Sequence, residues 1–306
     1  MSQSPSPSAS PSSADLAVRF EAERGRLRSV AYRMLGSLSE AEDAVQEGWL
    51  RLQRADSDDV RNLGGWLTTV VGRICLDMLR TRTARREDPL DPGTGEIHVP
   101  DPVIRPADAG DPVTEAELAD SVGLALLVVL DTLAPAERLA FVLHDMFTVP
   151  FEELAPIVER TPAATRQLAS RARRRVQGAT VPPDTDLARQ RVVVDAWLAA
   201  SRAGDFEALL ELLDPDVLLR VDAGPGAATK LVRGALEVAG QAAFYGRMAP
   251  ASYAAFVGDA MGIVAAPEGR VTSILGFTFR DGKVVGVDII ADPERLAATP
   301  LGWPRP

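Results

Sequence analysis

The hydrophobic pattern of the chain changes near residue 181, and this change limits the folds that the chain can adopt. Before it, apolar residues recur with the 3.6-residue period of α-helices. After it, two helical segments precede runs of strand-like composition: VLLRVD, MGIVAAP, VTSILGFTFR and KVVGVDIIA. Asp281-Gly282 joins the last two runs and is typical of a two-residue β-hairpin turn. A chain of 306 residues with this pattern is expected to form several domains, all-α first and α+β last.

Composition narrows the function and the compartment. The formal charge of −10 argues against a general nucleic-acid binder, although local basic clusters still decide partners. Cys75 is the one cysteine, so no intrachain disulfide forms, a reducing cytoplasmic compartment is favoured, and a buried structural thiol is predicted. One cysteine and two histidines exclude a zinc cluster, and no cofactor is expected. No apolar run reaches the roughly 18 residues of a membrane span.

A stretch rich in proline and glycine, 89–112, divides the helical part and predicts a flexible linker. Before it, one helix ends at Gly36, after an apolar stripe of Leu27, Val30, Ala31, Met34 and Leu35. Ser39 and Glu42 are predicted to form a capping box that starts a second helix. A third helix is predicted from Gly65 to Arg86.

Helical signal returns at Thr114 and continues in short pieces. Thr161 and Pro162 are an N-cap and a first helical residue for PAATRQLASRARRRVQ. Short helices with tight turns and a basic last helix predict a helix-turn-helix.

The second helix, in AEDAVQEGWLRL (41–52), has an unusual polar face. Helical spacing places Ala41, Ala44, Val45, Gly48 and Leu52 on one side, with Trp49 at its flank. Leu50 falls on the opposite side, among Asp43, Gln46 and Glu47. Two interpretations stay open: a lone exposed leucine without function, or an apolar anchor ringed by carboxylates that meets a basic partner.

Two helices carry basic faces. On the helix from Pro162, Arg166, Gln167, Ser170 and Arg174 share one side, flanked by Arg171 and Arg173. Arginine and glutamine pair with base edges in the major groove, whereas arginines near a helix C-terminus also complement the helix dipole. The basic end of the helix from Gly65 is expected either to neutralise DNA phosphates or to be a solvated helix end. Trp66 is expected either to stack on an unpaired base or to pack in the core.

These segments, in this order, resemble a known family. AYRMLGSLSEAEDAVQEGWLRL (31–52) with WLTTVVGRICLDMLR (66–80) resembles region 2 of the extracytoplasmic-function (ECF) sigma factors, and residues 130–176 resemble region 4. The remainder resembles the subset with a C-terminal SnoaL-like, NTF2-type domain, through DFEALLELLDPDV (205–217) and ADPERL (291–296). The linker motif of that subset, Trp-Leu-Pro-Glu-Pro, is reduced here to HVPDP (98–102).

The resemblance implies a division of the chain. The predicted parts are a disordered Ser/Pro tail over 1–14, region 2 over 15–88, the linker over 89–112, region 4 over 113–180 and a SnoaL-like regulatory domain over 181–306. The implied fold is two all-α sigma domains, a helical bundle and a helix-turn-helix, followed by an α+β NTF2-like cone.

The resemblance also implies partners and site residues. The large-subunit clamp helices of bacterial RNA polymerase core would meet Asp43, Gln46, Glu47, Trp49 and Leu50. The promoter −10 element would meet Arg61, Asn62, Trp66, Arg73, Arg80 and Arg82, and the −35 element Arg166, Gln167, Ser170, Arg171 and Arg174. An intramolecular regulatory contact to the sigma domains or linker would use Asp292, Pro293, Glu294, Arg295 and Leu296.

Two other functions compete with a sigma factor. A ligand-responsive helix-turn-helix regulator would need no region 2. A SnoaL-like enzyme would need acid–base groups in the cone, yet residues 181–306 contain no histidine. Asp222, Tyr245, Asp259 and Asp288 are candidates for a pocket there, with surface or turn positions as the alternative. We therefore expect no enzymatic activity.

Overall fold

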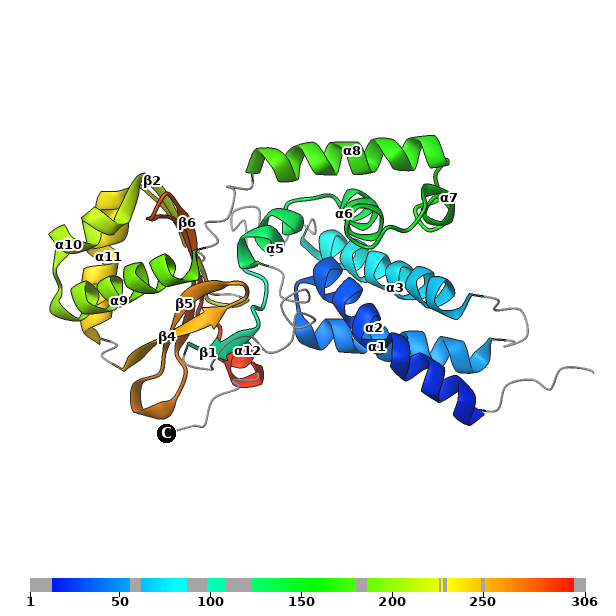
Figure 1. The fold of residues 1–306 in the computed structure, drawn as a ribbon, viewed down its shortest axis with the longest axis horizontal. Coiled ribbons are helices and arrows are strands. Elements are labelled where there is room, and N and C mark those ends of the chain that lie inside the picture. The colour runs from blue at the N-terminus through cyan, green and yellow to red at the C-terminus, as the bar shows by residue number, and fades with distance from the viewer. Residues whose placement is uncertain are drawn as a thin grey trace, which may run out of the picture. The chain divides into compact units, whose positions relative to one another are not determined.

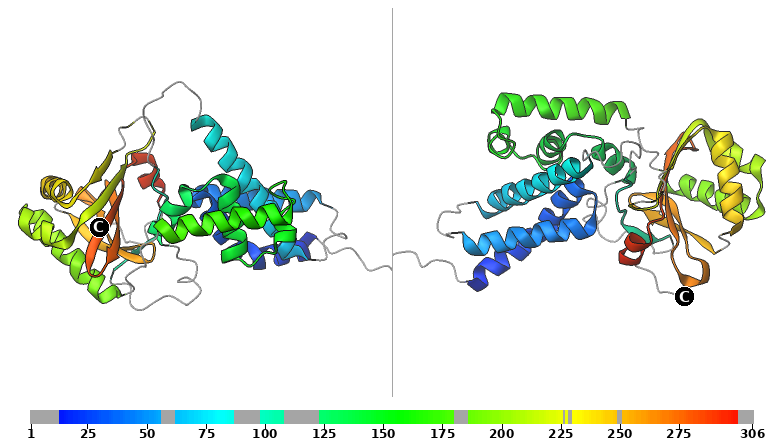
Figure 2. Two further views of the ribbon diagram at one scale, coloured as in Figure 1. Left: turned by 90° about the horizontal axis from the view of Figure 1, so that it is seen from above. Right: turned by 180° about the vertical axis from the view of Figure 1, so that it is seen from behind.

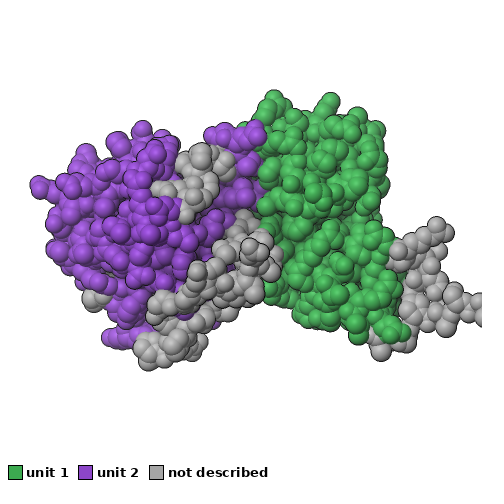
Figure 3. Space-filling model, viewed as in Figure 1, with its two compact units in different colours: residues 1–88, 133–175 green, residues 89–132, 176–306 purple. Residues whose placement is uncertain are grey.

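The structure is a computed structural model that describes residues 13–55, 62–86, 98–107, 123–179, 186–225, 227, 230–248 and 251–299. The chain divides into two compact units, residues 1–88 with 133–175 and residues 89–132 with 176–306 (Figure 3). This division differs from the predicted domains, because it places part of the predicted region 4, and the predicted linker, in the unit of the C-terminal domain.

The first unit begins with three long helices, α1(Ser13–Leu35), α2(Leu38–Arg54) and α3(Leu63–Arg86) (Figure 1). The predicted stripe of α1 is buried, and Gly36 ends the helix with a φ of 72°. The predicted capping box is wrong, because α2 begins one residue before Ser39, after Ser37 as N-cap. Glu42 instead forms ion pairs with Arg24 and Arg28 of α1.

The rest of the first unit is a series of helices, of which the first, α6(Pro135–Phe141), packs on α3. The others are a π-helical turn η2(Val142–Met146), α7(Phe151–Leu154) and α8(Pro162–Ala179). Gly72 of α3 makes the close approach possible, because a Cβ there would lie 3.0 Å from Cδ1 of Leu143. Cys75 is fully buried in α3, and burial raises the pKa of its thiol.

The second unit is built on a seven-stranded sheet in the order β1-β4-β5-β6-β7-β2-β3. Its strands are β1(Ile104–Pro106), β2(Leu213–Asp222), β3(Lys230–Arg233), β4(Ser252–Val257), β5(Ala260–Ala265), β6(Ser273–Arg280) and β7(Lys283–Ile290). All neighbours are antiparallel except β2 and β7. The predicted hairpin is confirmed: Asp281 and Gly282 join β6 to β7 with φ values of 52° and 75°, as a type I′ turn requires.

Both faces of this sheet are covered. Helices α9(Leu187–Ala203), α10(Phe206–Leu212) and α11(Ala235–Met248) lie over the inner face (Figures 1 and 2). The outer face carries α5(Leu124–Asp131), the segment 98–107 and α12(Pro293–Ala298). Side chains alternate between the two cores: Met261 and Ile263 of β5 point inward and Val264 outward. The predicted fold class, helical domains followed by an α+β domain, is confirmed.

The segment 98–107 corrects one prediction. A flexible linker was predicted over 89–112, but within it Ile104–Pro106 pairs with β4, and Val99 and Ile104 are buried in the outer-face core. Apolar burial and backbone pairing outweigh the proline content here, because Pro106 is at an edge strand that needs few N–H donors. The predicted helical residues 114–122 lie outside the described part of the chain. None of the described helices is long and apolar enough to cross a membrane.

Candidate functional site

Helix α2 presents the polar stripe that its sequence predicts. It buries Ala41, Ala44, Val45, Gly48 and Leu52, as predicted. On the other side, the side chains of Asp43 and Gln46 are exposed and form no hydrogen bond or ion pair with a described residue. Glu47 accepts a hydrogen bond from Arg51 Nε at 2.9 Å. Leu50 is 37% exposed. Trp49 is half-buried, with its ring 4.9 Å from that of Phe20, so Leu50 is the exposed large apolar side chain of this stripe.

The residues expected at the −10 element differ in how firmly they are held. Arg61 lies outside the described residues. Asn62 caps α3, its Oδ1 accepting from the Gly65 N–H at 3.1 Å. Arg73 donates to the Pro156 carbonyl at 3.3 Å, and Arg80 pairs loosely with Asp77 at 3.7 Å. Both arginines are exposed, and Trp66 is half-buried.

Arg82 has a structural role that its sequence did not indicate. It donates to the Leu35 carbonyl at 3.2 Å and forms an ion pair with Glu40. Its side chain is only 22% exposed, so it fastens α3 to the connection between α1 and α2. Glu40 is 42 residues away from Arg82 in the chain, so local sequence patterns do not indicate this pair.

Helix α8 separates into a buried and an exposed side. Thr161 Oγ1 accepts from the Ala164 N–H at 3.2 Å, which confirms the predicted N-cap. Thr165, Ala169 and Ala172 are buried, while the exposed set is Arg166, Gln167, Ser170 and Arg174. The Arg166 guanidinium lies 5.1 Å from the ring centre of Phe151, which links α8 to α7.

The other arginines of α8 are tied to α6 and η2. Glu137 is 6% exposed and accepts hydrogen bonds from Arg171 Nε at 2.8 Å and Arg175 at 2.7 Å. Arg173 bonds Asp145 in the same way. Arg171, expected to contact the −35 element, therefore braces the fold, and the periodicity of α8 does not indicate the buried carboxylate 34 residues away.

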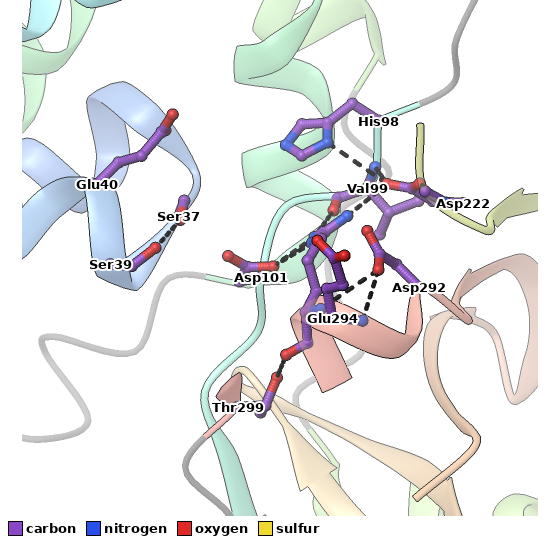
Figure 4. A network of polar contacts seen from close by, with 12 residues as sticks. Ser37, Ser39, Glu40, His98, Val99, Asp101, Asp222, Asp292, Glu294 and Thr299 are labelled. Atoms are coloured by element: carbon purple, nitrogen blue, oxygen red, sulfur yellow. Dashed lines mark hydrogen bonds and ion pairs between the residues drawn. The ribbon is translucent and has the colours of Figure 1, made fainter. Parts of the chain in front are cut away.

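In the second unit, the residues of HVPDP and ADPERL meet on the outer face of the sheet (Figure 4). Arg295 Nε donates to Asp101 Oδ1 at 2.7 Å, a terminal nitrogen reaches Asp222 Oδ2 at 2.6 Å, and another bonds the Val99 carbonyl. We call Val99, Asp101, Asp222 and Arg295 the latch. Asp292 caps α12 through the N–H groups of Glu294 and Arg295, and Leu296 is buried in the outer-face core.

Asp222 is the centre of the latch. Its carboxylate also accepts from the Val99 N–H at 2.9 Å and the Gly224 N–H at 3.1 Å, and lies 3.4 Å from His98 Nδ1. Burial opposes its charge, but the hydrogen bonds from His98 and Val99, with the Arg295 charge, outweigh burial and hold the pKa of this carboxyl well below its usual value. The latch is therefore charged at neutral pH.

The inner face of the sheet, with α9 and α11, forms a cavity of about 600 Å³ that is open to solvent on one side. Of the four candidates from the sequence, Tyr245 lines it. Asp222 is in the latch, Asp288 pairs with Arg220, and Asp259 is in the turn between β4 and β5, where burial raises its pKa. No described lining residue is a histidine, cysteine, aspartate or glutamate, and His98 is on the outer side with Asp222. The lining thus offers no carboxylate or imidazole base.

Comparisons with known proteins agree with this arrangement. Residues 19–85 match the family model for Sigma-70 region 2. The chain is 40% identical to the ECF RNA polymerase sigma factor SigJ of Mycobacterium tuberculosis over 298 residues, 92% of this chain and 93% of the relative. It is 40% identical over 207 residues to a probable ECF sigma factor, SigI, of the same organism, covering 68% of this chain and 70% of the relative.

The fold agrees as well. The crystal structure of SigJ from Mycobacterium tuberculosis superposes with a TM-score of 0.70 at 38% identity, covering 93% of this chain and 99% of that one. The similarity thus extends through both sigma regions and the C-terminal α+β domain. The chain belongs to the extracytoplasmic-function family of RNA polymerase sigma factors.

Proposed function

We propose that the chain is a promoter-specificity subunit of bacterial RNA polymerase whose activity is set by its own C-terminal domain. As an ECF sigma factor it binds the polymerase core and promoter DNA and directs transcription initiation. The observation that carries the proposal is the 40% identity to an ECF sigma factor over 92% of the chain, because it covers the sigma regions and the C-terminal domain together.

The polymerase interface in this proposal is the exposed stripe of α2. Asp43 and Gln46 bond no described residue, and Leu50 presents an apolar group between them and Glu47. Such a surface fits the basic clamp helices of the large subunit: the carboxylates steer and orient, and the leucine is buried on docking.

The promoter interfaces are α8 and α3. The side chains of Gln167 and Ser170 are exposed and form no hydrogen bond with a described residue, and Arg166 lies over the ring of Phe151, so these three suit contacts with base edges of the −35 element. Trp66, Arg73 and Arg80 suit a −10 element that is opened to single strands. A net charge of −10 keeps the free chain from coating DNA.

The proposed regulation is inferred from the contacts at the outer face of the C-terminal sheet. The latch holds the segment 98–107, and Leu124 and Val128 of α5 are buried in the same core, so the C-terminal domain binds both the connection between the sigma regions and the start of region 4. Because all these segments belong to one chain, modest contact energy is enough to select one arrangement of the sigma regions.

The competing functions have less support. A ligand-responsive helix-turn-helix regulator has no use for helices that match Sigma-70 region 2 over 19–85. An enzyme in the C-terminal domain would have to act without a described carboxylate or imidazole in its cavity.

Transcription in vitro tests the proposal. Core polymerase is incubated with the full chain on a library of genomic promoter fragments, and transcripts are compared with those of core polymerase alone. We expect discrete start sites that need the chain. The proposal fails if the chain binds DNA by itself but leaves the start sites of core polymerase unchanged, which is what a separate regulator would do.

A further inference from the structure

The cavity in the C-terminal domain has a consistent chemical character. Its walls are apolar, from side chains such as Trp197, Leu219 and Leu275. The charged groups in its described lining are two cations, Arg202 of α9 and Lys230 of β3, and no carboxylate accompanies them there. A lining with this charge balance complements an anion.

Several polar groups of the lining have no partner among the described residues. Lys230 is exposed and forms no ion pair there, and the side chains of Gln241 and Tyr245 on α11 make no hydrogen bond there. Ser201 is 5% exposed, and its hydroxyl is buried without a hydrogen-bond partner. That buried hydroxyl is not accessible from the cavity, so the polar groups free to meet a ligand are the side chains of Lys230, Gln241 and Tyr245.

We propose that this cavity binds a small organic acid: one carboxylate on an extended apolar body. Lys230 would meet the carboxylate, with Gln241 and Tyr245 as further donors, and the apolar walls would enclose the body. A volume of about 600 Å³ lies within the range of cavities that hold small-molecule ligands.

The cavity and the latch are two sides of the same strands. Val221 and Ile289 line the cavity, while their neighbours Asp222 and Ile290 face the outer core. Ala291 also lines the cavity, and Asp292 caps the helix that carries Arg295. A bound acid would therefore restrain the ends of β2 and β7, on which the latch is built, and would tighten the hold on residues 98–107.

Titration calorimetry with the full chain tests the binding, using dodecanoate below its micelle concentration and dodecylamine as the probe of opposite charge. We expect dodecanoate to bind one per chain and dodecylamine at least about tenfold more weakly, since a charge-assisted contact is gained only by the anion. Lys230→Glu should weaken dodecanoate by about tenfold or more, and Lys230→Met, which keeps the apolar stem, should weaken it in the same direction.

Lys283→Glu is the matched control, because Lys283 lies at the β6–β7 hairpin, outside the cavity lining. Ala242→Phe, which fills the cavity, should weaken both probes. The proposal is overturned if both probes bind equally, if Lys230→Glu binds dodecanoate as well as Lys283→Glu does, or if Ala242→Phe binds both probes normally.

Hydrogen exchange tests the coupling. Saturating dodecanoate should slow amide exchange in residues 98–107 and 291–299, whereas unchanged exchange in both segments would refute the coupling. These experiments contain neither polymerase nor DNA, so their failure would leave the proposed promoter function standing.

Discussion

Leu50 is the residue on which the proposed polymerase interface depends most. It is 37% exposed and lies away from the buried face of α2. Leu50→Ala should weaken binding to core polymerase by more than about 1 kcal/mol, as loss of an apolar anchor does, and Asp43→Arg should do so by charge reversal. Affinity by fluorescence anisotropy of the labelled chain checks this.

The control for Leu50 is Leu236→Ala, a leucine on α11 that is 66% exposed and outside the stripe. All three variants should keep the circular dichroism of the parent chain, because none of these side chains is in a core. Polymerase affinity that is unchanged in both stripe variants would remove α2 from the interface.

For the proposed contacts with the −35 element, the expected effect of a substitution on DNA binding depends on whether the side chain is already bonded within the protein. Gln167→Ala should cost about 1–3 kcal/mol on a cognate promoter and relax the preference at one base pair. Arg175→Ala should act differently, since Arg175 is bonded to the buried Glu137 and its loss lowers stability more than sequence preference. Binding to cognate and scrambled −35 duplexes distinguishes them; equal losses on both duplexes for Gln167→Ala would argue against base reading.

Residue type indicates which side chains suit DNA, but not which are already engaged. The exposed set on α8 followed from helical spacing alone. Arg82 and Arg171 have the same chemistry, yet Glu40 and Glu137 hold them from 42 and 34 residues away. Such partners are set by tertiary packing, and the periodicity of a single helix carries no information about its contacts with other helices.

Among the elements, the close approach of α3 to η2 depends on Gly72. A Cβ there meets Leu143 at 3.0 Å, so Gly72→Val should strain this packing by about 1–3 kcal/mol, more than the few tenths that valine gains over glycine in helix propensity. Gly25→Val in α1 is the matched control, because no atom lies within 4 Å of an added Cβ there. Urea unfolding should show a lower midpoint for Gly72→Val and a nearly unchanged one for Gly25→Val; equal midpoints would show that the contact does not limit stability.

Long elements with a strong period were predictable, and short or edge elements were not. Helices α1, α2, α3 and α8 and the hairpin of β6 and β7 follow from apolar spacing, caps and the Asp-Gly turn. Strand β3 has four residues, α12 has six, and β1 contains a proline, so none has a pattern long enough to read. Helix α11 contains Gly240 and Gly246, and Gly246 is required by its approach to Ser201, where a Cβ would lie at 2.5 Å. A glycine that packing requires thus lowers the helix propensity of a segment that is nevertheless helical.

For the molecule as a whole, the outer face of the C-terminal sheet is the surface on which segments from separate parts of the chain meet. Segments that precede this domain by tens of residues cover it, with Leu124 seated where Gly276 leaves space. The motifs HVPDP and ADPERL were recognisable in the sequence, but their meeting at Asp222 was not, because Asp222 belongs to neither motif.

The last prediction concerns the latch. Arg295→Ala leaves Asp101 and Asp222 without their cation, and should cost about 3 kcal/mol, the lower end of the range for a broken buried pair because the arginine is 20% exposed. Arg191→Ala, which breaks a surface pair with Asp195 on α9, should cost less than about 0.5 kcal/mol.

The effect of the latch depends on pH. Because the pKa of Asp222 is depressed, the contribution of this carboxylate to stability is complete above the usual carboxyl pKa and is lost only as the pH falls below it. Limited proteolysis at pH 7 should therefore cleave 98–107 faster in Arg295→Ala than in the parent chain or in Arg191→Ala. Promoter-dependent transcription should change several-fold in this variant, and in a chain ending before Ala291, relative to the parent and to Arg191→Ala. If cleavage accelerates while transcription stays the same in both, the latch holds the segment without regulating the polymerase, and the regulatory part of the proposal is wrong.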